Sequence, residues 1–172
     1  MPQSAPQFSW PELFQQHEPA LVLFARRWAD FHADAEDMVQ EALVRVLRVT
    51  PEEVSDPLAY LYTCVRNVGN EFKRTVSRRA RREVEVAAER PTEALFQCPL
   101  EQQERTLQVE AAIGRLAKVR QEVVLLKIWS GLTFPQIGDV LQISPNTAAS
   151  RYRHALIELK DTLSRTDQGT VQ

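Results

Sequence analysis

Apolar side chains recur at steps of three and four residues through the N-terminal half of the chain, which predicts three amphipathic helices. We place them at residues 19–31, 34–48 and 57–82, with Asp34 and Asp56 as N-caps of the second and third. The positions expected to form a shared core are Leu21, Phe24, Ala25, Trp28, Met38, Val39, Ala42, Leu43, Val46, Leu47, Leu61, Val65, Val68 and Phe72.

The helical period fades between Glu83 and Glu101, where acidic residues dominate and Pro91 and Pro99 interrupt any helix. This stretch predicts an extended linker. Beyond it, four further helices are expected at residues 107–116, 119–129, 133–141 and 145–163.

The pattern as a whole predicts an all-α protein of two small helical domains joined by an acidic linker. The first domain, of three or four helices, covers residues 8–86, and the linker covers 87–105. The second domain covers residues 106–165 and is followed by a tail at 166–172.

The third and fourth helices of the second half are separated by so few residues that they predict a helix-turn-helix. Thr133 caps the first of the pair, and Ser144-Pro145 starts the second. The inward face of the second helix is predicted to hold Pro145, Ala148, Tyr152, Ala155 and Leu159. Its outward face, which could hydrogen-bond to DNA, holds Asn146, Ala149, Ser150 and Arg153, and Arg151 and His154 flank them. An ordinary helical hairpin with a solvated polar face is the alternative at this point.

Charge is segregated along the chain although the net charge is only −2. Residues 30–56 are strongly acidic, Lys73 to Arg82 contains bases and no acids, and residues 115–160 are again rich in bases. Such alternation indicates that the protein meets more than one kind of surface.

Several function classes are not favoured by the sequence. Cys64 and Cys98 have no metal-ligand spacing and are expected to be reduced structural thiols. No nucleophile with a base, glycine-rich phosphate loop or metal spacing indicates an enzyme, a cofactor or a metal site, and the cluster around His32 matches no standard ligand set. No run long and apolar enough to span a bilayer is present, so a cytoplasmic location is expected.

Three segments resemble the sigma factors of bacterial RNA polymerase. Residues 131–152, GLTFPQIGDVLQISPNTAASRY, resemble the promoter-binding helix-turn-helix called region 4.2, although LuxR-type response regulators carry a similar motif. Residues 34–43, DAEDMVQEAL, resemble region 2.2 of the extracytoplasmic-function group, and residues 57–67, PLAYLYTCVRN, resemble its strand-opening segment. The resemblance extends over roughly residues 18–163.

The resemblance implies a non-enzymatic factor that directs core polymerase to promoters. It implies that Glu36, Asp37, Gln40 and Glu41 bind the clamp helices of the largest subunit, and that the flap region is a second contact. It assigns −10 element binding and melting to Tyr60, Tyr62, Arg66, Asn67, Lys73 and Arg74. It assigns −35 reading to Asn146, Thr147, Ala149, Ser150, Arg151, Arg153 and His154. An anti-sigma factor is a further candidate partner.

The sequence differs from the family pattern at several positions, and some of its features have a second interpretation. Tyr60 stands where Trp is usual, Ala117 where Pro is usual and Gln121 where Arg is common. Ala149 lies where Lys or Arg often contacts DNA, and a methyl group cannot read guanine. A specialised promoter is therefore our hypothesis. The acidic residues could form a solvated helix face, and the bases of 73–82 a disordered tail. Either Tyr60 or Tyr62 is expected in the core, since both cannot share a helix face. A DNA-binding regulator that never binds polymerase is the main alternative function.

Overall fold

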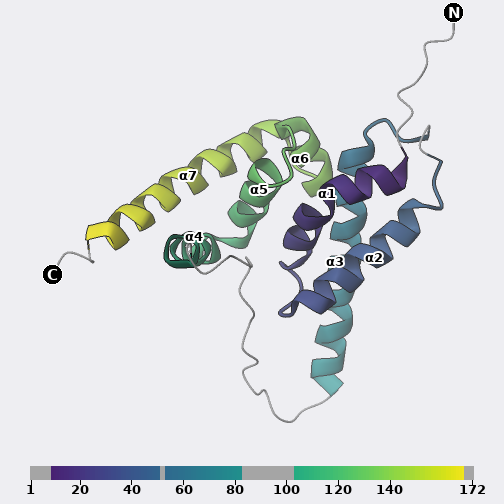
Figure 1. The fold of residues 1–172 in the computed structure, drawn as a ribbon, viewed down its shortest axis with the longest axis horizontal. Coiled ribbons are helices and arrows are strands. Elements are labelled where there is room, and N and C mark those ends of the chain that lie inside the picture. Colours follow the sequence, from purple (N-terminus) through teal and green to yellow (C-terminus); the bar gives the residue numbers. More distant parts are fainter. Residues whose placement is uncertain (1–8, 51–52, 83–102, 169–172) are drawn as a thin grey trace, which may run out of the picture. The chain divides into compact units, whose positions relative to one another are not determined.

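The computed structural model describes residues 9–50, 53–82 and 103–168, and within them the chain forms seven α-helices in two compact units (Figure 1). The units divide between Glu93 and Ala94, inside the segment predicted as the linker. Residues 87–102 of that segment lie outside the described residues, whereas residues 103–105 already belong to the first helix of the second unit. The predicted all-α fold of two helical domains is confirmed.

The first unit contains α1 (Trp10–Ala25), α2 (His32–Val46) and α3 (Pro57–Arg82), each of which contacts the other two. Their shared core is built from fully buried side chains spaced at helical intervals, which removes most of their apolar surface from water. These include Leu21, Phe24, Val39, Val46, Leu61, Tyr62 and Val65.

Two helix starts in this unit were predicted incorrectly. The first helix begins at Trp10 rather than Pro19, because the Ser9 hydroxyl accepts from the Glu12 amide and Pro11 suits the first turn. It ends at Ala25. The second begins after Phe31, which makes no side-chain cap, so Asp34 lies in the first turn instead of capping it.

The predicted start of the third helix is confirmed. The Ala59 amide donates to Oδ1 of Asp56 at 3.0 Å, and Pro57 opens the helix. The basic segment from Lys73 onward continues the same helix to Arg82, so the alternative of a disordered basic tail does not hold there.

The second unit contains α4 (Gln103–Arg115), α5 (Lys118–Ile128), α6 (Phe134–Leu141) and α7 (Pro145–Gln168). The long helix α7 contacts the other three helices. Its buried Ala148 and Ala155 meet a core that includes Ile113, Leu116, Val124, Leu126, Leu132, Ile137 and Val140. Pro145 was predicted to face inward but is exposed, because it occupies the first position of α7 at the rim of the turn.

Candidate functional site

The acidic residues predicted to bind a protein partner lie on the exposed face of α2. Glu36, Asp37, Gln40 and Glu41 are all exposed, because the opposite face of the helix buries Ala35, Met38, Val39 and Ala42 in the core. The structure therefore brings these four side chains together on one surface, which we call the α2 acidic face.

Arg45 connects the α2 acidic face to α3. Its guanidinium donates from Nη1 and Nη2 to the two carboxylate oxygens of Glu71 at 2.9 and 2.7 Å, and from Nε to Glu41 at 3.1 Å. This bidentate pair holds the pKa of Glu71 below its usual range, chiefly through the hydrogen bonds from Arg45. Glu71, which was not predicted as a site residue, thereby joins the acidic surface.

A groove of about 260 Å³ lies between α2 and α3. Its apolar residues, Met38, Val68 and Phe72, are bordered by four carboxylates and a threonine: Asp34, Asp37, Glu41, Glu71 and Thr75. An apolar floor with an acidic border suits a basic amphipathic helix of another protein.

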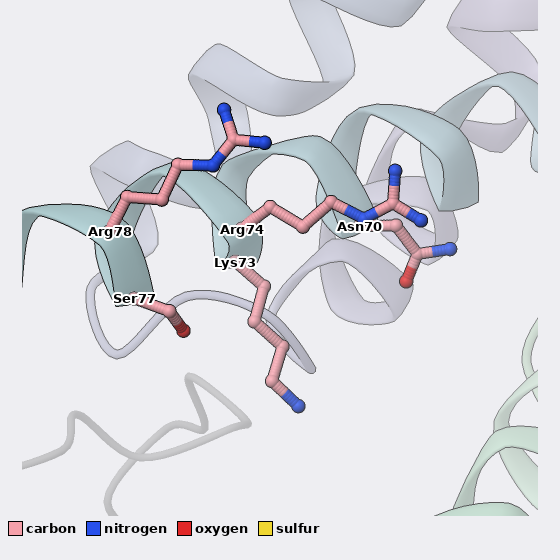
Figure 2. A pocket seen from close by; sticks show the side chains of 5 residues that line it. All are labelled: Asn70, Lys73, Arg74, Ser77 and Arg78. Carbon is pink, nitrogen blue, oxygen red and sulfur yellow. The ribbon is translucent and has the colours of Figure 1, made fainter. Parts of the chain in front are cut away.

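The basic face of α3 is a continuous stripe that we call the α3 stripe. It comprises Asn70, Lys73, Arg74, Ser77 and Arg78, which recur at three and four residues and line a shallow cavity of about 480 Å³ (Figure 2). The four residues from Lys73 onward are exposed. Three cations on one helix face attract phosphate groups without reading sequence. Asn70 and Ser77 were not predicted as site residues.

The aromatic residues predicted to contact an opened DNA strand fall in different environments. Tyr62 is fully buried, with its ring 5.7 Å from that of Phe24, so in this structure it is a core residue and not a DNA contact. Tyr60 is half-buried; burial raises the pKa of its phenol, and the neighbouring Cys64 adds to the shift. Asn67 is exposed and Arg66 is partly exposed on the same helix.

Trp10 lies beside Tyr60 and was missed by the sequence analysis. Its ring centroid is 6.0 Å from that of Tyr60, and its indole N–H donates to the Val49 carbonyl at 2.8 Å. The Ser-Trp-Pro sequence at residues 9–11, typical of a helix start, was the available signal for it.

The turn between α6 and α7 has the local chemistry that the sequence predicts. Thr133 and Gln136 form a reciprocal capping box, and Ser144 Oγ accepts from the Thr147 amide at 3.0 Å. Between them Gln142 adopts the left-handed conformation, with φ 57°. A Cβ on Gly138 would lie 2.7 Å from the Ile143 carbonyl oxygen, so the close approach of the turn requires glycine there.

The predicted DNA-reading residues lie along the first turns of α7. Asn146, Arg153 and His154 are exposed. The partly exposed members of the set are Thr147, Ala149, Ser150 and Arg151. The rings of Phe134 and Tyr152 meet edge to face at 5.7 Å, which supports α7 against α6.

Features of other site classes are missing from the part of the chain that the structure describes. No group of three or more His, Cys, Asp or Glu side chains there could hold a metal ion. None of the described helices has the length and apolar character needed to cross a bilayer.

Comparison with family models gives two matches in chain order. Residues 13–82 match sigma-70 region 2, and residues 106–159 match sigma-70, region 4. Together the two matches cover more than two thirds of the 172 residues.

Three curated relatives are each 28% identical to the chain. The chain is 28% identical over 169 residues to the "ECF RNA polymerase sigma factor SigE" of Mycolicibacterium smegmatis, covering 95% of this chain but only 65% of that protein. It is 28% identical over 160 residues to the "RNA polymerase sigma-E factor" of Streptomyces avermitilis and of Streptomyces coelicolor, covering 91% of this chain and 86% of each relative.

Two solved structures share the fold. The Bartonella quintana sigma factor RpoE, crystallised with the anti-sigma factor NepR, has a TM-score of 0.61 at 23% identity, covering 90% of this chain and 96% of that one. CnrH in complex with the cytosolic domain of CnrY has a TM-score of 0.61 at 21% identity, covering 91% and 88%.

Proposed function

The chain belongs to the sigma-70 family, in its extracytoplasmic-function group, and from that premise we propose that it binds RNA polymerase core and directs promoter-specific initiation. In this proposal residues 8–86 bind core and the −10 element, and residues 106–165 read the −35 element. Residues 87–105 link the two domains. We also propose a cytoplasmic location and an anti-sigma factor as a further partner, as the Bartonella neighbour has one.

The observation that carries this proposal is the presence of two oppositely charged surfaces on the three-helix unit. The α2 acidic face offers carboxylates to a basic protein surface, whereas the α3 stripe offers cations to phosphate groups. A regulator that only binds DNA needs the second surface and has no use for the first.

The DNA contacts follow from exposure and chemistry. Tyr60 and Asn67 are the proposed contacts to unpaired bases of the −10 element, with Arg66, Lys73 and Arg74 on the backbone. Stacking on an aromatic face contributes about 1–3 kcal/mol per base. On α7, Asn146, Ser150 and Arg153 are proposed to contact the −35 element, with Thr147, Ala149, Arg151 and His154 beside them.

Run-off transcription with core polymerase, with and without this protein, on a pool of promoter fragments tests the proposal. Start sites that appear only with the protein are expected, and they should be lost in the double variant Glu36→Lys and Asp37→Lys. Like-charge contact at an interface costs several kcal/mol, so core affinity should fall at least about tenfold.

The reversed residues are chosen so that a loss of transcription reports on the α2 acidic face and not on the packing of α2 against α3. Glu41 is left unchanged because Arg45 bonds to it, so its reversal would also disturb the connection to α3. Glu18→Lys, on the exposed face of α1, makes one such charge reversal away from the α2 acidic face and should leave transcription intact. No new transcripts and no co-elution with core, but specific duplex binding by the chain, would favour the DNA-binding regulator.

A further inference from the structure

The side-chain amide of Asn70 is held in one orientation by Trp28. The Trp28 indole N–H donates to Asn70 Oδ1 at 3.1 Å. An indole N–H can only donate, so its partner must be the carbonyl oxygen, and the amide nitrogen takes no part in this bond. The orientation of this amide therefore follows from chemistry.

Trp28 is itself firmly placed, which makes it a suitable anchor. Its ring meets Phe24 edge to face at 5.2 Å and lies against the backbone of Gly69, where a Cβ would come within 2.4 Å of Cδ2. The Arg27 guanidinium lies 4.8 Å from the ring centroid on a face of the indole. The Asn70 carbonyl thus bonds to a donor that has little freedom to move.

The charged residues that line the cavity of the α3 stripe beside Asn70 are all cations. Asn70 begins the α3 stripe, and Arg74 extends along the helix toward it (Figure 2). Glu71 is the only acid of α3, and both of its carboxylate oxygens accept from Arg45. No carboxylate lines the cavity of the α3 stripe.

We propose that Asn70, Lys73, Arg74, Ser77 and Arg78 form one surface for the phosphate backbone of nucleic acid, with Trp28 as the positioning residue that presents the Asn70 amide nitrogen to one phosphate. The cations supply charge, while the amide and the Ser77 hydroxyl supply directional donors. The inference rests on the proposed function, since the phosphate is that of promoter DNA. It adds two neutral donors and a remote tryptophan to the contacts expected from charge alone.

The Asn70→Asp substitution tests the site with little change of shape. A carboxylate can still accept from Trp28, so folding should be preserved, but it places an anion where the amide nitrogen donated. We expect the reconstituted holoenzyme to bind promoter DNA roughly tenfold more weakly. The slope of log affinity against log salt should fall by about 0.7–0.9, which corresponds to one phosphate contact. Both are measured by fluorescence anisotropy over a potassium chloride series.

Two further variants separate the site from folding and from net charge. Gln16→Glu makes the same amide-to-carboxylate change on the exposed face of α1 and should leave affinity and slope unchanged. Arg78→Gln removes an exposed cation of the α3 stripe without changing Trp28, and should lower the slope of log affinity against log salt by a similar amount. This variant tests the site if Asn70→Asp is too unstable to assay.

A double-mutant cycle tests the role of Trp28. Trp28→Phe keeps a ring beside Phe24 but removes the indole N–H, so it should weaken DNA binding in the wild-type background and much less in an Asn70→Ala background. Equal losses in the two backgrounds would overturn the positioning role.

Promoter binding by the wild-type holoenzyme distinguishes failure of the proposed function from failure of the phosphate site. If it forms no promoter complex, the proposed function and this site both fail. If it forms one and Asn70→Asp matches Gln16→Glu in affinity and salt slope, the phosphate site alone is wrong.

Discussion

Arg45 has a measurable electrostatic effect because it bonds to both carboxylate oxygens of Glu71. The folded-state pKa of Glu71 lies below its usual 4.5, so the pair's contribution to the free energy of unfolding is complete above that value. It is lost as the pH falls through the lowered pKa. We expect Arg45→Gln to return Glu71 to its ordinary titration range, as followed by NMR of the side-chain carboxyl carbon.

The change in stability should be small, below about 1 kcal/mol, since both side chains are more than one third exposed. Arg48→Gln, an exposed arginine one turn away, is the control and should leave the titration of Glu71 where it is. An unchanged Glu71 titration in Arg45→Gln would contradict the assignment of the shift to this pair.

Two glycines in helices should respond to alanine with opposite signs. Gly69→Ala places its Cβ 2.4 Å from a Trp28 ring atom, and we expect the free energy of unfolding to fall by about 1–3 kcal/mol. Gly114→Ala meets nothing within 4 Å and should raise it by about 0.5–1 kcal/mol. Urea denaturation followed by tryptophan fluorescence measures both, and a stabilised Gly69→Ala would refute the close approach of Trp28.

At the scale of elements, the sequence predicts helices well where periodicity and capping agree. The third helix, with Asp56 as its cap, and the α6–α7 turn, with Thr133 and Ser144, lie where they were expected. The first helix was misplaced because Pro19 was interpreted as a start, whereas it lies inside α1. A proline is tolerated there because the rest of the helix is held by its buried face, including Leu21 and Phe24, and local propensity yields to that packing.

The turn between α6 and α7 stores a small conformational cost at Gln142. A non-glycine residue at φ 57° pays about 1 kcal/mol that glycine does not. We expect Gln142→Gly to raise the midpoint of thermal unfolding of the second unit, and Gln142→Val to lower it, since a β-branched side chain fits this conformation poorly. Circular dichroism on both variants checks the order, and the reverse order would contradict the left-handed turn.

At the scale of the molecule, the sequence predicts which surfaces are exposed better than it predicts which distant residues are hydrogen-bonded to each other. The exposed α2 acidic face follows from helical periodicity, because burying one face of a helix leaves the opposite one in solvent. By contrast, the Trp28–Asn70 and Arg45–Glu71 hydrogen bonds join residues 42 and 26 positions apart. No local pattern specifies such pairs, because they depend on how α1, α2 and α3 pack. Tyr62 was misassigned for the same reason: one of two neighbouring tyrosines had to be buried, and packing decided which.

If one domain binds the −10 element and the other the −35 element, the predicted linker has a function of its own. The linker makes the second promoter contact intramolecular. Tethering can raise affinity by about 10²–10⁴ without any new contact. We therefore place a protease recognition sequence within residues 87–105 of the full chain, cleave after folding, and measure run-off transcription at fixed protein concentration. Promoter-specific transcripts should fall on the order of a hundredfold, because the −35 contact then depends on free fragment. The same sequence inserted and cut in the tail at 166–172 should have no such effect. Undiminished transcription after linker cleavage would mean that the two domains are held on the promoter complex by something other than the covalent tether.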